Sequence, residues 1–267
     1  MRSVKLSVVY VGPLVLAALL AGCASSSVDR TATMSPNDIY AEAKEEIAAG
    51  QFDKAIALLD KLEARAAGTP LAQQAQLDKA YTQYKTSEPA QALATLERFI
   101  KLHPASPALD YALYLKGTIN FNDDLGMFSQ LTLQDLSERD QKAAKESFEA
   151  FKELVTRFPD SRYAPDARLR MNYIVNSLAQ YEVHVARYYY RRGAYLAAVN
   201  RAQITVTDYR NVPAVEEALF ILYKSYDALG MTQLRDDARR VLESSYPDSE
   251  FLSRGARLST GPWWKVW

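Results

Sequence analysis

A two-helix pattern recurs in this chain at an interval of 37 residues. Ala55 follows a glycine turn and an aromatic residue, and Ala92 occupies the equivalent position 37 residues later. The same interval separates Ala198 from Arg235. A repeat of this length is one pair of helices that buries its apolar face only against its neighbours. The spacing therefore predicts an all-α chain, an α-solenoid of about five helix pairs.

Helix ends and composition support this prediction. The segment 50–56 (GQFDKAI) resembles the tetratricopeptide pattern, in which Gly closes the turn and a small residue lets the two helices approach. One helix is predicted to end at Leu102-His103-Pro104, and two later helices end at Phe or Tyr followed by proline, at Phe158-Pro159 and Tyr246-Pro247. Glycine is scarce, with 10 residues in 267, and no alternation typical of strands is sustained.

The repeats predict the following organisation. Residues 36–106 form repeats 1 and 2, and residues 107–250 form repeats 3 to 5, with an insertion near 122–140. We interpret this insertion either as a loop without contacts or as one that contacts a partner. The tail, 251–267, carries Trp263, Trp264 and Trp267, which are costly to leave in water. We expect them to lie against the last helices, a partner or lipid headgroups.

The N-terminus indicates export and an anchor. Arg2 and Lys5 precede an apolar run, and Leu20-Ala21-Gly22-Cys23 resembles the lipobox of bacterial lipoproteins. That resemblance implies a signal peptide over 1–22, with N-acyl and S-diacylglycerol groups on Cys23, and residues 23–35 then form a lipidated tether. Ala24 and Ser25, and no Asp, come directly after Cys23, which by the same resemblance favours the outer membrane. The alternative is a plain signal peptide or an uncleaved anchor, with Cys23 an incidental thiol.

No combination of residues indicates catalysis. His103 and His184 are far apart, and the chain has no Cys/His metal spacing, phosphate-binding glycine loop or nucleophile elbow. Basic and acidic residues balance at 32 each, which does not favour a nucleic-acid surface. We therefore predict protein binding, with no enzymatic activity, cofactor or metal.

Four stretches resemble one family. They are RFIKLHP (98–104), DYALYLKG (110–117), FPDSRY (158–163) with DA (166–167), and LAQYE (178–182) continuing through VARYY (185–189) to AAVNR (197–201). These runs resemble the BamD family, the D lipoprotein subunits of the outer-membrane β-barrel assembly machinery, also called competence lipoproteins. The resemblance implies a location in the outer membrane of a Gram-negative bacterium, facing the periplasm.

The same resemblance implies partners. They are the barrel-forming A subunit, other assembly lipoproteins, and unfolded outer-membrane protein precursors recognised by a C-terminal targeting strand. The arginine of the Asn-Arg pair, Arg201, matches a position in the family's contact with the A subunit. Neighbouring basic residues are candidates for the same surface: Arg187, Arg191 and Arg192. The alternative for these arginines is an ordinary solvated basic face.

Helix positions further predict a peptide groove. If the first helices of repeats 1 and 2 line the concave face, the exposed positions include Asn37, Tyr40, Lys44, Gln74, Leu77, Tyr81, Tyr84 and Lys85. Tyrosines beside lysines suit an extended peptide with aromatic side chains and a terminal carboxylate. For each tyrosine the alternative is packing between helices.

Two other functions remain open at this stage. The repeats alone also fit a tetratricopeptide lipoprotein that organises pilus or cell-wall machinery. A repeat scaffold carrying a cell-wall hydrolase is a third hypothesis, for which the sequence offers no candidate catalytic Glu.

Overall fold

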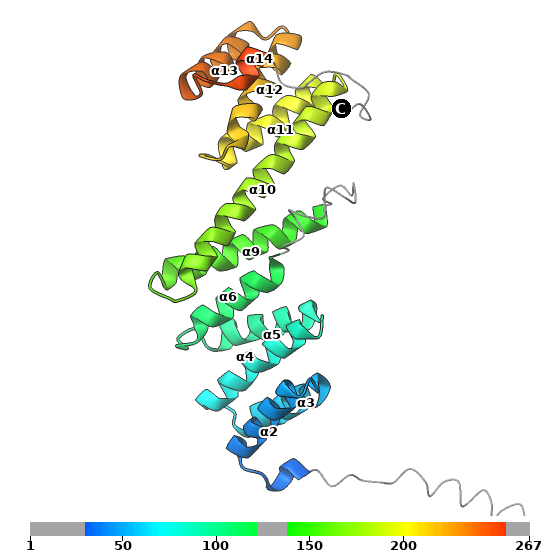
Figure 1. Ribbon diagram of the computed structural model, residues 1–267, viewed down its shortest axis with the longest axis vertical. Coiled ribbons are helices and arrows are strands. Elements are labelled where there is room, and N and C mark those ends of the chain that lie inside the picture. Colours follow the sequence, from blue (N-terminus) through cyan, green and yellow to red (C-terminus); the bar gives the residue numbers. More distant parts are fainter. Residues whose placement is uncertain (1–29, 122–137, 255–267) are drawn as a thin grey trace, which may run out of the picture. The chain divides into compact units, whose positions relative to one another are not determined.

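The computed structural model describes residues 30–121 and 138–254, and the predicted all-α class is confirmed there (Figure 1). These ranges contain a 3-10 helix (Arg30–Thr33) and α-helices, and no strand. The α-helices are α2 (Pro36–Ala48), α3 (Phe52–Arg65), α4 (Pro70–Lys85), α5 (Pro89–Leu102), α6 (Leu109–Asn120), α9 (Glu138–Arg157), α10 (Ala164–Arg191), α11 (Tyr195–Asp208), α12 (Ala214–Ala228), α13 (Thr232–Ser245) and α14 (Glu250–Arg254).

Several predicted features lie outside the described residues. They are Cys23 with its signal peptide, most of the insertion (122–137), and the three tryptophans of the tail. Helix α9 begins at Glu138, so the last residues of the predicted insertion are helical. Likewise, the first residues of the predicted tail belong to α14.

The start of the first repeat is fixed by side-chain capping. Ser35 precedes α2, and its hydroxyl accepts a hydrogen bond from the Asp38 amide, while the Asp38 carboxylate accepts one from the Ser35 amide. Pro36 occupies the first turn, where no amide donor is needed. Together these contacts form a capping box, which fixes the start of α2 at Pro36.

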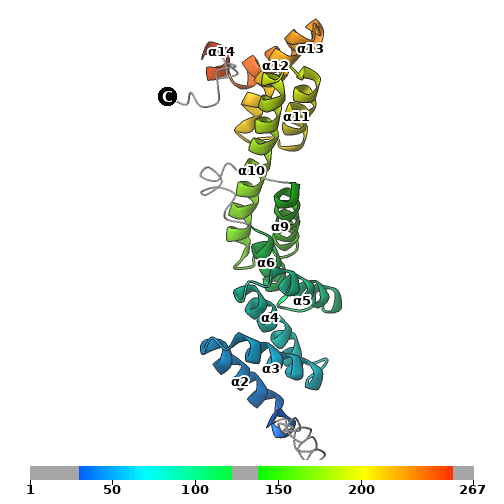
Figure 2. The same ribbon diagram turned by 90° about the vertical axis from the view of Figure 1, so that its right-hand side faces the viewer.

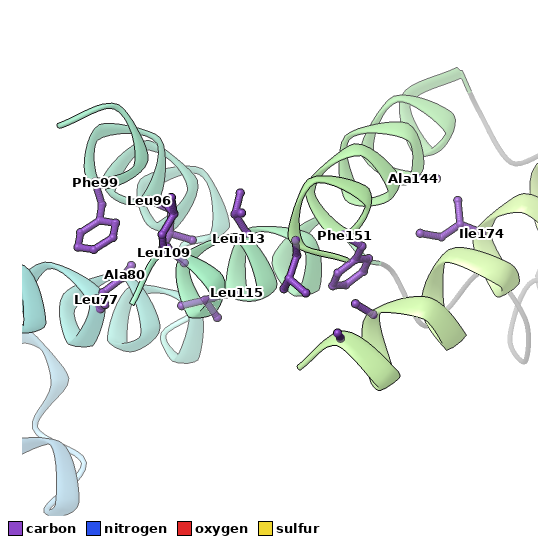
Figure 3. Close-up of a cluster of buried hydrophobic side chains, with 14 residues drawn as sticks. Leu77, Ala80, Leu96, Phe99, Leu109, Leu113, Leu115, Ala144, Phe151 and Ile174 are labelled. Carbon is purple, nitrogen blue, oxygen red and sulfur yellow. The ribbon is translucent and has the colours of Figure 1, made fainter. Parts of the chain in front are cut away.

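Contacts divide the chain into two compact units, residues 1–75 and 76–267, with the division inside α4. In unit 1, α2 and α3 enclose a cluster of apolar side chains centred on Ile39, Leu59 and Leu62, all fully buried. In unit 2, a larger cluster joins the end of α4 with α5, α6, α9 and the first half of α10 (Figure 3). A further cluster joins the second half of α10 with α11, α12 and α13.

Four repeats share one turn geometry. At the end of the first helix, Gly50, Ser87, Gly193 and Gly230 have φ of 72°, 62°, 74° and 70°. In each turn this residue donates to the carbonyl three positions back, and the next residue donates to the carbonyl five positions back, which is a Schellman motif. Positions 50 and 87, like 193 and 230, are 37 residues apart, so the turn carries the repeat period even where serine replaces glycine.

In the third helix pair, α6 and α9 pack unusually close together at Gly117. A Cβ at Gly117 on α6 would lie 2.5 Å from Cε1 of Phe151 on α9, whose side chain is fully buried. The Ser147 hydroxyl donates to the Gly117 carbonyl at 2.8 Å. Glycine at this position therefore lets the phenyl ring lie directly on the backbone of α6.

Helix α10 is the longest described element, with 28 residues. Its first half contributes Ala164, Ala167 and Ile174 to one core cluster, and its second half contributes Val183 and Ala186 to another. In both views α10 runs from beside α9 to beside α11 (Figure 1 and Figure 2). Helix α10 therefore contributes to the cores of repeats 3, 4 and 5.

Candidate partner-binding surface

The four predicted arginines lie at the second half of α10 and on α11, as expected, but they differ in their contacts. Arg187 on α10 faces Glu217 on α12, and its Nε and one terminal nitrogen donate to the two carboxylate oxygens at 2.7 Å each. The Glu217 side chain is 16% exposed. This forked pair is an internal link between α10 and α12.

Arg201 on α11 is also paired inside the protein. Its guanidinium donates to Oε2 of Glu182 on α10 at 3.1 Å. The Glu182 side chain is 8% exposed, whereas that of Arg201 is 41% exposed. Burial raises the pKa of the nearby Tyr209, and the negative charge of Glu182 raises it further.

The remaining two arginines lie at the end of α10. Arg191 occupies the last turn, and Arg192 is the C-cap residue; both are exposed. The Arg192 guanidinium lies 5.3 Å from the centre of the Tyr188 ring, and Tyr188 is 51% exposed. We refer to Tyr188, Arg191 and Arg192 as the tip of repeat 4. A stacked arginine and tyrosine at the surface are typical of protein-binding sites.

One predicted groove residue is wrong. Leu77 is 1% exposed and packs with Leu96, Phe99 and Leu109 in the core of unit 2 (Figure 3). Both α5 and α6 contribute side chains to this cluster, so this face of α4 is covered rather than open.

The other predicted groove residues of α4 are exposed. Tyr81 and Tyr84 are 38% and 37% exposed, and Lys85 Nζ lies 5.6 Å from the centre of the Tyr81 ring. Positions 81, 84 and 85 are neighbours on one helix face. They remain a predicted peptide-binding face.

Tyr40 and Lys44 belong to unit 1. Tyr40 is half-buried and packs against the cluster of α2 and α3, as the packing alternative for this tyrosine expects. Lys44 is exposed on the same helix.

The structure brings together residues that sequence reasoning did not select as a site. The Tyr114 and Tyr163 rings stack, with centres 4.7 Å apart and planes at 19°. The Tyr114 hydroxyl donates to Asp166 at 2.8 Å, and Arg170 Nε donates to the same carboxylate oxygen at 2.7 Å. Burial opposes ionisation of Asp166, but these two hydrogen bonds hold its pKa below the ordinary value.

Two of the four family-like runs meet close to these residues. Run 110–117 lies on α6, and run 158–167 leads into α10, and they meet where the Ser161 hydroxyl donates to Asp110 at 2.6 Å. Both runs therefore carry side chains that join repeat 3 to repeat 4.

A hollow of about 560 Å³ lies between α5, α6 and α9. Ile100, Leu113 and Ala150 contribute apolar surface, and the remaining lining is mainly Lys, Arg and Glu. Several of these charges form ion pairs, including Lys152 with Glu149 at 3.5 Å.

Two further findings concern the described residues alone. Within 30–121 and 138–254, no helix combines the length and apolar character needed to cross a membrane. The same part of the chain has no group of three or more His, Cys, Asp or Glu side chains placed to hold a metal ion.

The successive helix pairs define a helical-repeat protein. The chain belongs to the YfiO family of outer membrane lipoproteins, whose model matches residues 32–242.

Individual relatives agree with this assignment. The chain is 46% identical over 253 residues to the outer membrane protein assembly factor BamD of Neisseria meningitidis serogroup A, covering 93% of this chain and 95% of that protein. It is 35% identical over 225 residues to the protein of the same name from Vibrio cholerae, covering 84% and 93%. Among solved structures, the MamA protein aligns over 82% of this chain and 94% of its own, at 17% identity and a TM-score of 0.32, too low to support an argument.

Proposed function

We propose that this protein is an outer membrane protein assembly factor that acts as a binding scaffold without catalysing a reaction. The observation that carries the proposal is its 46% identity, over 93% of the chain, to a protein of that name. A chain of helix pairs supports it, because stacked helices present long continuous surfaces to other proteins.

The proposed partners are the barrel-forming A subunit, other assembly lipoproteins and unfolded outer-membrane protein precursors. We place the A subunit at repeats 4 and 5, near the tip of repeat 4. We place precursor peptides at the exposed face of α4 that carries Tyr81, Tyr84 and Lys85, where rings and a cation are available to aromatic side chains and a carboxylate.

The proposed anchor is lipid on Cys23, which holds the protein to the outer membrane with its repeats in the periplasm. Two or three acyl chains bind far more firmly than one, because each buried methylene contributes about 0.8 kcal/mol. Cys23→Ser is expected to abolish lipid incorporation and release the protein from the membrane fraction. Continued outer-membrane fractionation without incorporated lipid would show that another segment anchors the chain.

Depletion of the protein in its own host tests the function. Folded outer-membrane proteins are expected to decrease as it is depleted, and wild-type protein supplied from a second promoter should restore them. Unchanged porin levels after complete depletion would contradict the proposal.

Affinity purification in mild detergent provides a second test. It is expected to recover a large barrel protein with periplasmic domains, whereas recovery of a secretin or cell-wall synthases would favour the pilus or cell-wall alternative.

A further inference from the structure

We infer that residues 30–34 form a docked strap on unit 1, that Arg65 is the positioning residue of this strap, and that the strap keeps repeat 1 close to the membrane. We refer to residues 30–34 as the N-terminal strap. They belong to the predicted tether (23–35), which the strap therefore shortens. The docking of the strap rests on geometry alone, whereas the distance to the membrane rests on the proposed anchor at Cys23.

A shared carbonyl oxygen ties the strap to the end of α3. Arg30–Thr33 form a 3-10 helix, and Thr31 is only 7% exposed. The Arg65 guanidinium, in the last turn of α3, donates to the Thr31 carbonyl, and the Met34 amide donates to the same oxygen at 3.1 Å. In a free tether this carbonyl would be hydrogen-bonded to water, so these contacts make the strap part of the folded unit.

Apolar packing holds the other end of the strap. Met34 lies directly before the N-cap residue Ser35 and packs on the cluster of unit 1 that contains Ile39. Met34 and Ile39 occupy the two positions of a hydrophobic staple, which fixes the direction in which the chain enters a helix. The chain before α2 is thus held at Thr31, at Met34 and at the capping box of Ser35.

The strap limits the distance between repeat 1 and the lipid. Twelve residue steps lead from Cys23 to Ser35, but only seven lead from Cys23 to Arg30. At about 3.6 Å per fully extended residue, these lengths are about 43 Å and about 25 Å. With the strap docked, Arg30 at the edge of unit 1 therefore lies within about 25 Å of the acylated residue.

The sequence of the strap permits a direct test. Arg30 is the only lysine or arginine between Cys23 and the start of α2, so trypsin can cut this part of the chain only there. Cleavage after Arg30 requires the strap to detach, because proteases act on locally unfolded segments. The rate of this cleavage therefore reports the population of the detached strap, provided that the strap opens and closes faster than trypsin cuts.

The experiment uses full-length lipidated protein in vesicles of phosphatidylethanolamine and phosphatidylglycerol. The vesicles are treated with trypsin and sedimented, and mass spectrometry quantifies released chains that begin at Thr31. Arg65→Ala should accelerate cleavage after Arg30 roughly five- to tenfold, as expected for the loss of one hydrogen bond. Met34→Ser should also accelerate it, and Arg65→Lys, which keeps a charged donor, should have a smaller effect.

Lys54→Ala is the matched control. Lys54 is exposed in the first turn of α3, and its loss, like that of Arg65, removes one positive charge and one trypsin site. This variant should be cut after Arg30 at the rate of the wild type. Circular dichroism verifies that each variant remains folded, and Arg65→Lys and Met34→Ser still test the strap if Arg65→Ala does not fold.

The distance to the membrane is measured separately. A fluorophore on Lys54→Cys transfers energy to an acceptor on the lipid headgroups, and Arg65→Ala in that background should lower the transfer efficiency because the strap is released. An unchanged efficiency would overturn the limit on distance.

The docking of the strap has its own refuting result. Equal cleavage rates after Arg30 in the wild type, Arg65→Ala and Met34→Ser would show that residues 30–34 are not docked. If the wild type does not sediment with vesicles before trypsin is added, the proposed anchor fails. The cleavage rates of the protein in solution would then still decide whether the strap is docked.

Discussion

Replacement of Gly117 by alanine tests how closely α6 and α9 approach. The new methyl carbon would lie 2.5, 2.6 and 2.8 Å from three ring atoms of Phe151. Carbon atoms in favourable contact are about 3.5–4.0 Å apart, so the ring must retreat by about 1 Å. Phe151 is fully buried in the core of unit 2, so its ring can retreat only if the side chains packed around it also shift.

Two opposing terms set the expected magnitude. Alanine in a helix interior is favoured over glycine by up to about 1 kcal/mol. Overpacking a well-packed core costs about 1–3 kcal/mol. We expect the second term to be larger, with a net loss of about 1 kcal/mol in the free energy of unfolding. For a unit of this size, that loss lowers the melting temperature by roughly 2–4 °C.

Urea unfolding followed by circular dichroism measures this loss, and a second variant supplies the control. In a Phe151→Leu background the side chain is smaller, so Gly117→Ala should become neutral or stabilising there. The two substitutions should therefore be non-additive, as expected for residues in contact. Equal cost in both backgrounds, or a stabilised Gly117→Ala single variant, would refute the proposed ring-on-backbone contact.

Three further predictions concern other parts of the chain. Serine at φ 62° is strained, so Ser87→Gly should stabilise the protein by about 0.5 kcal/mol in urea unfolding. Gly193 has φ 74°, so the reciprocal change Gly193→Ser should destabilise the protein for the same reason. The Phe251 ring of α14 lies 5.9 Å from the Phe220 ring of α12, centre to centre. Phe251→Ala should weaken the packing of α14 on α12, so limited proteolysis should cut near residue 250 faster. An unchanged cleavage rate would count against this packing. Burial, with nearby negative charge, raises the pKa of Tyr111 from 10.0 to about 12, so the unfolded chain releases this proton at lower pH than the folded chain. The free energy of unfolding should therefore fall as pH rises from 10 to 12, and Tyr111→Phe should reduce that fall. A tyrosinate titration that shows no group of raised pKa would contradict this prediction.

Most of the fold followed from repeat spacing and helix-end residues. The repeat predicted from residue 36 begins where α2 begins, and the Gly turn of the segment 50–56 lies between α2 and α3. The equivalent turn at Ser87 carries no glycine, so only the backbone geometry reveals that it follows the same pattern. Helix α14 was not predicted, because its five residues are too few to show a periodic apolar face.

The candidate site was less predictable. Helical spacing placed Leu77 near Tyr81, but it did not reveal that α5 and α6 cover this face of α4. The arginines were placed in the correct repeat, while their partners Glu182 and Glu217 were missed because these are distant in sequence from Arg201 and Arg187. Such pairings depend on how helices pack, which a single sequence does not encode in its local pattern.

The length of α10 has a mechanical consequence. Twenty-eight helical residues span about 42 Å, and the helix is anchored in a different core cluster at each end. A helix is stiff along its axis, so a tilt of about 5° at one end displaces the other end by about 4 Å. Ala167 and Ala186 lie on the same uninterrupted helix, so a tilt of α10 near Ala167 would also displace the backbone near Ala186. A change in the tilt of the first half of α10 would therefore displace α11 and α12, which pack against its second half.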